Sequence, residues 1–270
     1  MNDLCKLTRT RGTFVKSHLL PRALTRPSKP GNPFIEHGEG RRPVKRWDSW
    51  FDYGLVTREG EDILAEIDDA GITELRRHRL VWSGRTAGGA DPLPDSFDET
   101  SGVGIRIVAG VDVHSLALFF LSLLWRCAAS KRPEMSDISI PIDRLERLRC
   151  MLVRRSHNPL AAYPFMLTQL TQVGEAHNHA PTAITMPPAT LHGESSRPVP
   201  VFRFYLDGLI ANFIRKPSRK TPPFPFDEKS RRMVVMTQTT DKSFQIQNLH
   251  KAILDANHTW PNVMSRLVRP

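Results

Sequence analysis

The chain opens with two side chains that could do chemistry, a thiol and an imidazole. Cys5 stands near the start, and His18 follows in the stretch Ser17-His18-Leu19-Leu20-Pro21. Zinc-stabilised turns commonly take their ligands as C-x-x-C pairs, because this spacing lets both thiolates of a tight turn face one ion. The position three residues after Cys5, where a second cysteine would stand, holds Thr8. The first turn is therefore predicted to have the outline of a metal-binding knuckle with a single thiolate.

A second ligand pair is expected just before the first amphipathic helix. That place reads Thr57-Arg58-Glu59-Gly60 and is followed by Glu61. Three of the four ligand positions thus hold Thr8, Thr57 and Gly60. One cysteine cannot hold zinc, and hydroxyls are poor substitutes for thiolates. We therefore expect no bound metal and no other cofactor.

The order of these motifs resembles an uncharacterised bacterial family with an N-terminal zinc-binding module similar to HNH nucleases. The matching residues are Cys5, Ser17, His18, Pro21, Glu61, Trp125, Arg126 and Ser130. The resemblance covers roughly residues 1–155, and its most specific parts are Ser17–Pro21 and the stretch LSLLWR at 121–126. It implies a treble-clef-like fold for the start of the chain and a role connected with nucleic acid. Thr8, Thr57 and Gly60 depart from the family's pattern.

The resemblance makes His18 the candidate catalytic residue. In an HNH-type site a histidine on a hairpin deprotonates the attacking water, while a cation held partly by a short carboxylate stabilises the leaving oxygen. Ser17 stands in the place of that carboxylate, and the following helix offers only His78 as a further ligand. The alternative is that His18 packs or hydrogen-bonds within the knuckle. The letters His177-Asn178-His179 coincide with the motif's name only, since the motif's residues are well separated in sequence.

A second candidate lies on the apolar stretch at 111–130. Ser122, Arg126 and Ser130 are spaced by four and share one face of the helix predicted there. An arginine flanked by hydroxyls could receive a phosphate or a buried carboxylate. The alternative is a structural arginine that ties this helix to another through Asp143 or Glu146. The sequence leaves both open.

The charge distribution favours a polyanionic partner. The formal net charge is +10, and the isoelectric point is near 9.9. Residues 1–46 carry eleven Lys and Arg against three acidic residues, and residues 215–232 carry seven against two. The candidate nucleic-acid-binding residues in these clusters are Arg41, Arg42, Lys45, Arg46, Arg215, Lys216, Arg219 and Lys220. If the two clusters converge in space, they form a phosphate-binding surface for DNA or RNA; the alternative is a basic but inert surface.

The three cysteines indicate a reducing compartment. Cys5, Cys127 and Cys150 are an odd, sparse set without framework spacing. The N-terminus lacks the apolar segment of a secretory signal. The longest apolar run is shorter than the ~20 residues that span a bilayer. We expect a cytoplasmic location and no membrane association.

The hydrophobic pattern predicts an α+β fold with a helical middle and a β-rich C-terminal half. Helices are expected within the stretch 57–82 with Thr57 as the N-cap, at 111–130 as the core helix, from about Asp143 to 155, and near the C-terminus at 244–260. Residues 27–46 and 83–104 are predicted to be loops, and a short strand-like piece is expected just after residue 137. After residue 160 the alternating, β-branched segments predict strands, mostly antiparallel. We divide the chain into a degenerate HNH- or treble-clef-like module, 1–80, and an α+β domain, 81–270.

The sequence as a whole predicts a nucleic-acid-associated protein that binds without catalysis. Two alternatives stay open: a divalent-metal-dependent HNH-type endonuclease that uses His18, and a protein-interaction partner in a mobile-element or phage-defence system. No nucleotide-binding loop, nucleophile elbow or zinc-protease helix is present in the sequence. Whether the protein is an enzyme is not decided by these residues.

Overall fold

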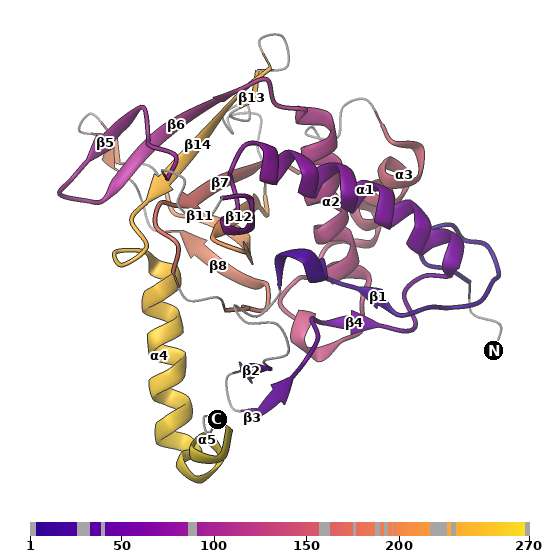
Figure 1. Cartoon of the computed structure of the whole chain (residues 1–270). Coiled ribbons are helices and arrows are strands. Elements are labelled where there is room, and N and C mark those ends of the chain that lie inside the picture. Colours follow the sequence, from indigo (N-terminus) through magenta and orange to yellow (C-terminus); the bar gives the residue numbers. More distant parts are fainter. Residues whose placement is uncertain are drawn as a thin grey trace.

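The computed structural model describes most of the chain. The described residues are 4–25, 33–38, 41–85, 91–156, 163–174, 177–186, 190–191, 194–195, 197–216, 226–227 and 231–267. They form an α+β structure with a mixed sheet and five α-helices (Figure 1), so the predicted fold class is confirmed. No helix in these ranges combines the length and apolar character needed to cross a membrane.

The central sheet has the strand order β5-β6-β14-β7-β12-β11-β8, with β13 paired to the start of β14. Its strands are β5 (Ser96–Asp98), β6 (Val103–Ala109), β7 (Phe165–Leu170), β8 (Thr182–Met186), β11 (Val199–Leu206), β12 (Leu209–Ile214), β13 (Phe226–Asp227) and β14 (Arg232–Gln238). Neighbouring strands are antiparallel except β14 and β7, which run parallel. The last strand is inserted between β6 and β7, so it joins both halves of the sheet.

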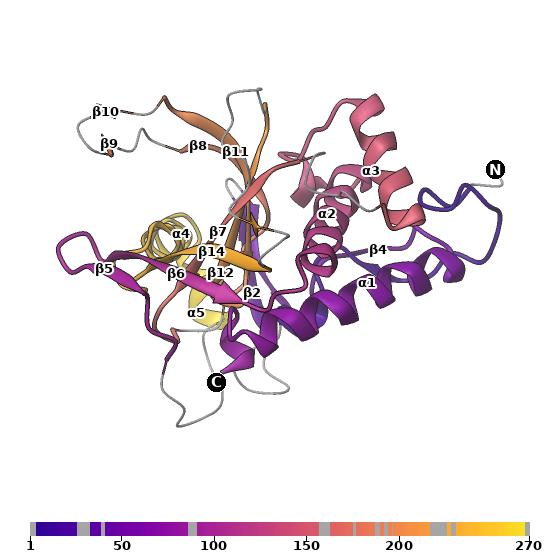
Figure 2. The same ribbon diagram turned by 90° about the horizontal axis from the view of Figure 1, so that it is seen from above.

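Three helices pack together on one side of the sheet, and two lie away from them (Figure 2). The three are α1 (Arg58–Arg77), α2 (Val113–Ala129) and α3 (Ile142–Arg154). The two are α4 (Phe244–Thr259) and α5 (Pro261–Leu267). Two caps fix helix starts, since Asp112 accepts from the backbone N–H of Ser115 and Ser243 accepts from that of Ile246. The four helices predicted from the sequence are confirmed.

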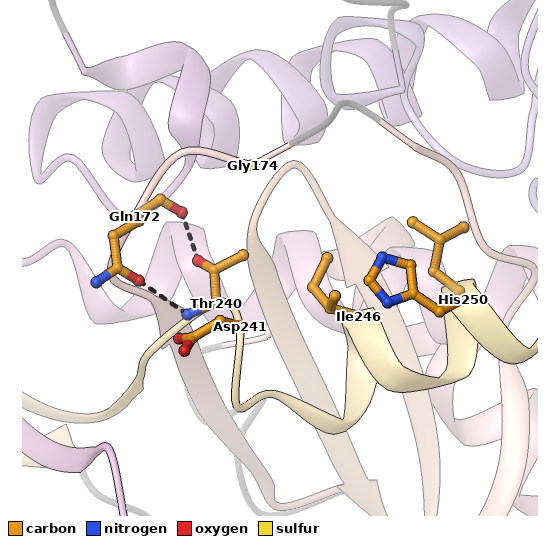
Figure 3. Close-up of a pocket in the computed structure, with 7 residues that line it drawn as sticks. Gln172, Gly174, Thr240, Asp241, Ile246 and His250 are labelled. Carbon is orange, nitrogen blue, oxygen red and sulfur yellow. Dashed lines mark hydrogen bonds between the residues drawn. The ribbon is translucent and has the colours of Figure 1, made fainter.

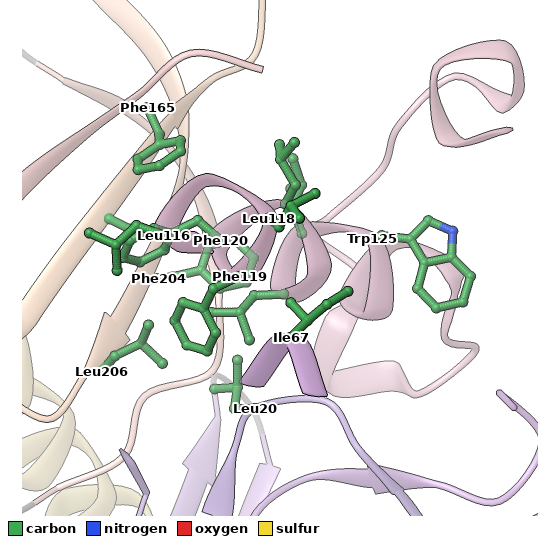
Figure 4. Packing of buried hydrophobic residues seen from close by; sticks show 14 of the residues in the cluster. Leu20, Ile67, Leu116, Leu118, Phe119, Phe120, Trp125, Phe165, Phe204 and Leu206 are labelled. Atoms are coloured by element: carbon green, nitrogen blue, oxygen red, sulfur yellow. The ribbon is translucent and has the colours of Figure 1, made fainter. Parts of the chain in front are cut away.

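The core is built around α2, which is buried on nearly all sides. Phe120 packs against Phe165 of the sheet with ring centroids 4.7 Å apart. On the opposite side Gly71 of α1 lets that helix approach so closely that an added Cβ would lie 2.3 Å from Phe119. Figure 4 shows this layer of aromatic and aliphatic side chains between sheet and helices. One buried cluster runs from Cys5 to Val235, so the core crosses the predicted boundary at residue 80.

The N-terminal segment contributes two small two-stranded sheets. β1 (Ser17–His18) pairs with β4 (Phe51–Asp52), and β2 (Phe34–Gly38) pairs with β3 (Arg41–Arg46). The remaining short elements are β9 (Thr190–Leu191), β10 (Glu194–Ser195) and the 3-10 turns Arg22–Leu24, Trp82–Gly84 and Pro133–Met135.

Three local predictions are wrong. The loop expected at 27–46 contains the β2–β3 hairpin, and the loop expected at 83–104 contains β5 and the start of β6. The first hairpin was not predicted because its charged residues and Pro43 are typical of loops. An isolated two-stranded ribbon tolerates both. The segment after residue 137, predicted as strand-like, is irregular and follows the turn at Pro133–Met135. Its Ile138 is buried in the core but belongs to no strand.

Candidate nucleic-acid interface

The two turns predicted as ligand pairs meet at the sulfur of Cys5. The backbone N–H groups of Thr8 and Thr57 each point at this Sγ from 3.4 Å. Cys5 is fully buried, and a Cβ added at Gly60 would lie 2.8 Å from its sulfur. Burial raises the pKa of Cys5, but the hydrogen bonds from Thr8 and Thr57 outweigh it and lower that pKa. A sulfur with two N–H donors thus fills the junction of the turns.

The neighbouring hydroxyls do not complete a metal cage. The Thr8 hydroxyl lies 2.6 Å from that of Thr10, which donates to Glu59 at 2.8 Å. Thr57 precedes α1, but its hydroxyl makes no capping hydrogen bond and is buried without a partner. Within the described part of the chain, no group of three or more His, Cys, Asp or Glu is arranged to hold a metal ion.

His18 faces a carboxylate that the sequence analysis did not single out. Its Nε2 lies 3.0 Å from Oδ1 of Asp48, and both side chains are partly exposed. Lys16 donates to the other oxygen of Asp48, and the Nε of Arg22 lies 3.8 Å from Oδ1. Partial burial raises the pKa of Asp48, but the hydrogen bonds from Lys16 and His18 prevail and lower it. An ionised carboxylate therefore sits among three basic side chains.

Ser17 does not take the carboxylate's place beside His18. Successive side chains of a strand point to opposite faces, and Ser17 is fully buried whereas His18 is partly exposed. Asp48 lies thirty residues further along the chain, and the pairing of β1 with β4 brings it to His18. Its only signal in the sequence was its place in the aromatic stretch that begins at Trp47.

Aromatic rings and cations alternate around this pair. The Lys16 ammonium lies 4.2 Å from the centre of the Phe51 ring, and the guanidinium of Arg132 lies 5.8 Å from it. Tyr53 meets Phe51 edge-on at 5.4 Å. Trp47 and Tyr53 are 65% and 62% exposed, so both side chains are open to solvent. We call the following set the hairpin surface: Lys16, His18, Arg22, Trp47, Asp48, Phe51, Tyr53 and Arg132.

The basic strand β3 runs directly into the hairpin surface. Arg42 and Arg46 are exposed and Lys45 is half-buried, and Arg46 is followed at once by Trp47. The strand also contacts the C-terminal helix α5. The side chain of Arg41 lies outside the described residues, although its backbone belongs to β3.

The second basic cluster lies elsewhere. Arg215 and Lys216 follow β12, with the Arg215 guanidinium 5.1 Å from the centre of the Phe202 ring. They leave the end of the sheet at which β14 begins, whereas β3 lies beyond the opposite end, beside α5 (Figure 1). Arg219 and Lys220 fall outside the described residues. The described parts of the two clusters therefore do not converge.

Arg126 lies beneath the hairpin surface rather than on it. Its guanidinium bonds both carboxylate oxygens of Asp68 on α1, and it donates to the backbone oxygen of His18 at 3.0 Å. Burial lowers the pKa of Arg126, but the charge of Asp68 more than offsets this and raises it. The partner is thus Asp68, not Asp143 or Glu146, and the geometry favours the structural alternative for Arg126.

Ser130 anchors β4, the strand that pairs with β1. Its hydroxyl donates to Asp52 of β4 at 2.7 Å, and Lys6 donates to the carbonyl of Ala129 at 2.7 Å. Arg126 therefore holds β1 and Ser130 holds β4 on the same helix, α2. The two residues position the hairpin surface from below.

A cavity in the described part of the chain lies away from the hairpin surface. A cavity of about 430 Å³ lies between the loop after β7 and the start of α4 (Figure 3). It is lined by Gln172, Gly174, Thr240, Asp241, Ile246, Leu249 and His250. None of the predicted site residues lines it. The nearby His177 stacks on Tyr205, with ring centroids 4.2 Å apart, whereas His179 Nδ1 lies 2.7 Å from the carbonyl of Ala180. The two histidines therefore contact different groups.

Comparison with known proteins adds no relative: no protein-family model, curated protein or solved structure matches this chain.

Proposed function

We propose that this protein binds nucleic acid through the hairpin surface and the adjoining strand β3, and that it binds without cleaving. The observation that carries the proposal is the pair of open aromatic rings, Trp47 and Tyr53, set among Lys16, Arg22 and the basic residues of β3. Aromatic faces stack on bases, and cations neutralise the phosphates between them. The net charge of +10 attracts a polyanion from a distance.

The proposal favours unpaired over paired strands. A base can stack on an exposed ring only when it is not stacked within a duplex, so Trp47 and Tyr53 suit single-stranded DNA or RNA. A cytoplasmic setting belongs to the same proposal, since Cys5, Cys127 and Cys150 are all free thiols.

Removal of the two rings tests this proposal. We expect Trp47→Ala and Tyr53→Ala each to weaken binding of a labelled single-stranded oligonucleotide roughly tenfold, since stacking contributes about 1–3 kcal/mol per base. Fluorescence anisotropy at low salt measures the dissociation constant. Phe244→Ala is the matched control, because Phe244 is an exposed ring on α4. Absence of binding by the wild type, or an equal loss in the control, would refute the proposal.

A metal-dependent endonuclease is the second candidate, and the His18–Asp48 pair favours it. A carboxylate that accepts a hydrogen bond from an imidazole can orient it as a general base. A general base contributes typically 10²–10⁴-fold, so His18→Ala would nearly abolish such an activity. The binding proposal expects no cleavage of plasmid or single-stranded DNA with Mg²⁺ or Mn²⁺ by the wild type. Metal-dependent nicking that His18→Ala removes while binding persists would place the endonuclease first.

A further inference from the structure

The face of the sheet that points away from α2 carries a row of exposed apolar side chains on two neighbouring strands. Ile105 and Ile107 of β6 stand opposite Met236 and Val234 of β14. They are 45%, 51%, 40% and 38% exposed, respectively. Alternate residues of the same strands, such as Val108 and Val235, are buried in the core. An antiparallel sheet with one solvated face normally carries polar residues there, so this face has the composition of a covered one.

Opposite charges bound the two ends of this apolar row. Asp98 ends β5 and Glu99 follows it in the turn that leads into β6, where Lys242 donates to the carbonyls of Glu99 and Thr100. Acidic side chains therefore predominate at this end. Arg231 and Arg232 lie at the other end, where β14 begins beside Ala109. β6 has seven residues, so the ends are about 20 Å apart at 3.3 Å per residue.

This pattern is complementary to a reversed copy of itself. A two-fold axis that lies in the plane of contact, perpendicular to β6, turns a second molecule face to face with the strand direction reversed. The row of Ile105 and Met236 then meets the row of Ile107 and Val234 from the partner copy. The acidic end of each copy meets the Arg231–Arg232 end of the other, as an isologous interface requires.

The edge of the sheet is closed to the competing mode of association. β5 is only three residues long, and beyond it the Asp95 carboxylate accepts the N–H of Ile107 at 2.6 Å. A carboxylate on an edge N–H blocks the addition of another strand. At this edge a partner therefore sits on the face rather than extends the sheet.

We infer that this face, formed by β5, β6 and β14, is the contact surface between two copies of the chain in a two-fold dimer. Four apolar side chains form only the centre of the contact, because a stable interface buries about 800 Å² on each partner. The charged ends complete it, so the dimer is expected to weaken as salt rises.

The oligomeric state tests this inference directly. Light scattering coupled to gel filtration should give twice the chain mass of 30.6 kDa for the wild type at roughly 10 µM and above. Ile105→Thr/Ile107→Thr keeps β-branched side chains but removes the apolar row, so the dissociation constant should rise at least tenfold. Ile142→Thr is the matched control, since Ile142 is an exposed isoleucine on α3. A monomeric wild type, or a double variant that dimerises like the wild type, overturns the inference.

A charge exchange tests the orientation of the two copies. Glu99→Lys and Arg232→Glu should each weaken the dimer, and the double variant should regain most of the lost affinity, because the reversed charges face each other again. Circular dichroism confirms that each variant stays folded. If the double variant is as weak as the sum of the two single ones, the two-fold arrangement is wrong.

Discussion

At the scale of single residues, a sulfur with two N–H donors joins the turns that could have held a metal. Gly60 leaves no room for a further ligand beside Cys5, and the described hydroxyls turn to Thr10 or stay unpartnered. We predict that the purified protein holds no stoichiometric zinc, because one thiolate does not complete a tetrahedral site. Elemental analysis of protein prepared without chelators measures this, and about one zinc per chain would contradict it.

Arg126 offers a second prediction at this scale. Arg126→Ala removes the partner of a carboxylate, Asp68, and of the buried Ser122 hydroxyl, which accepts from Arg126 at 2.9 Å. Breaking a buried ion pair by removing one member destabilises a protein by about 3–5 kcal/mol. Urea unfolding should show a loss of this size for Arg126→Ala. The double variant Arg126→Met/Asp68→Leu should recover most of the lost stability, since no charge is then left unpaired. An equal loss of stability in the double variant and in Arg126→Ala would show that the ion pair is not the cause.

At the scale of elements, a cluster of charged side chains fastens the N-terminal turn to α3. Arg9 and Arg149 both bind Glu146, and Arg149 also donates to the carbonyl of Leu7 at 2.6 Å. Hydrogen bonds from Arg149 and then Arg9 lower the pKa of Glu146 from 4.5 to about 2. The side chain is partly exposed, so the gain in stability is modest.

The depressed pKa of Glu146 fixes the sign of a pH effect. Between pH 4.5 and about 2 the unfolded chain binds more protons at Glu146 than the folded protein does. The stability from this carboxylate is therefore complete above pH 4.5 and is lost as pH falls through about 2. We expect Glu146→Gln to be less stable than the wild type at neutral pH and the difference to vanish near pH 2. Urea unfolding across this range measures it, with Asp69→Asn on α1 as control; a difference that does not change with pH would contradict the assignment.

At the scale of the whole molecule, one surface rather than two opposed clusters should govern nucleic-acid binding. We predict that reversing Arg41, Arg42, Lys45 and Arg46 to Glu weakens binding to all sequences alike. The slope of the logarithm of the binding constant against the logarithm of the salt concentration should become about 3 less negative. Each of the four lost phosphate contacts contributes roughly 0.7 to this slope for a single strand. Anisotropy titrations at several salt concentrations measure both effects. Arg147→Glu on α3 is the control, and an equal flattening in that variant would point to diffuse attraction.

The sequence by itself determined the class of the fold and helices α1 to α4, whereas α5 was not predicted. The apolar spacing of residues 113–129 and 58–77 is a local property, so the start of α1 and both ends of α2 were predictable to within two residues. The β-branched segments after residue 160 likewise predicted the strands of the C-terminal half. The charge distribution and the single thiol at Cys5 were also visible, since they need no partner to be recognised.

Only the tertiary structure decided which side chains meet. Asp48 reaches His18 because β1 pairs with β4, and Asp68 reaches Arg126 because α1 packs on α2. Both pairings join residues far apart in sequence, and no local pattern encodes such a contact. The β2–β3 hairpin escaped prediction for a related reason: its strand structure comes from the pairing of Phe34 with Arg46 and of Ile35 with Lys45, whereas the charged residues of β3 give no alternating apolar pattern in the sequence. The exposed row on β6 and β14 is likewise invisible in the sequence, where its residues read as ordinary core positions until the fold shows which face α2 covers.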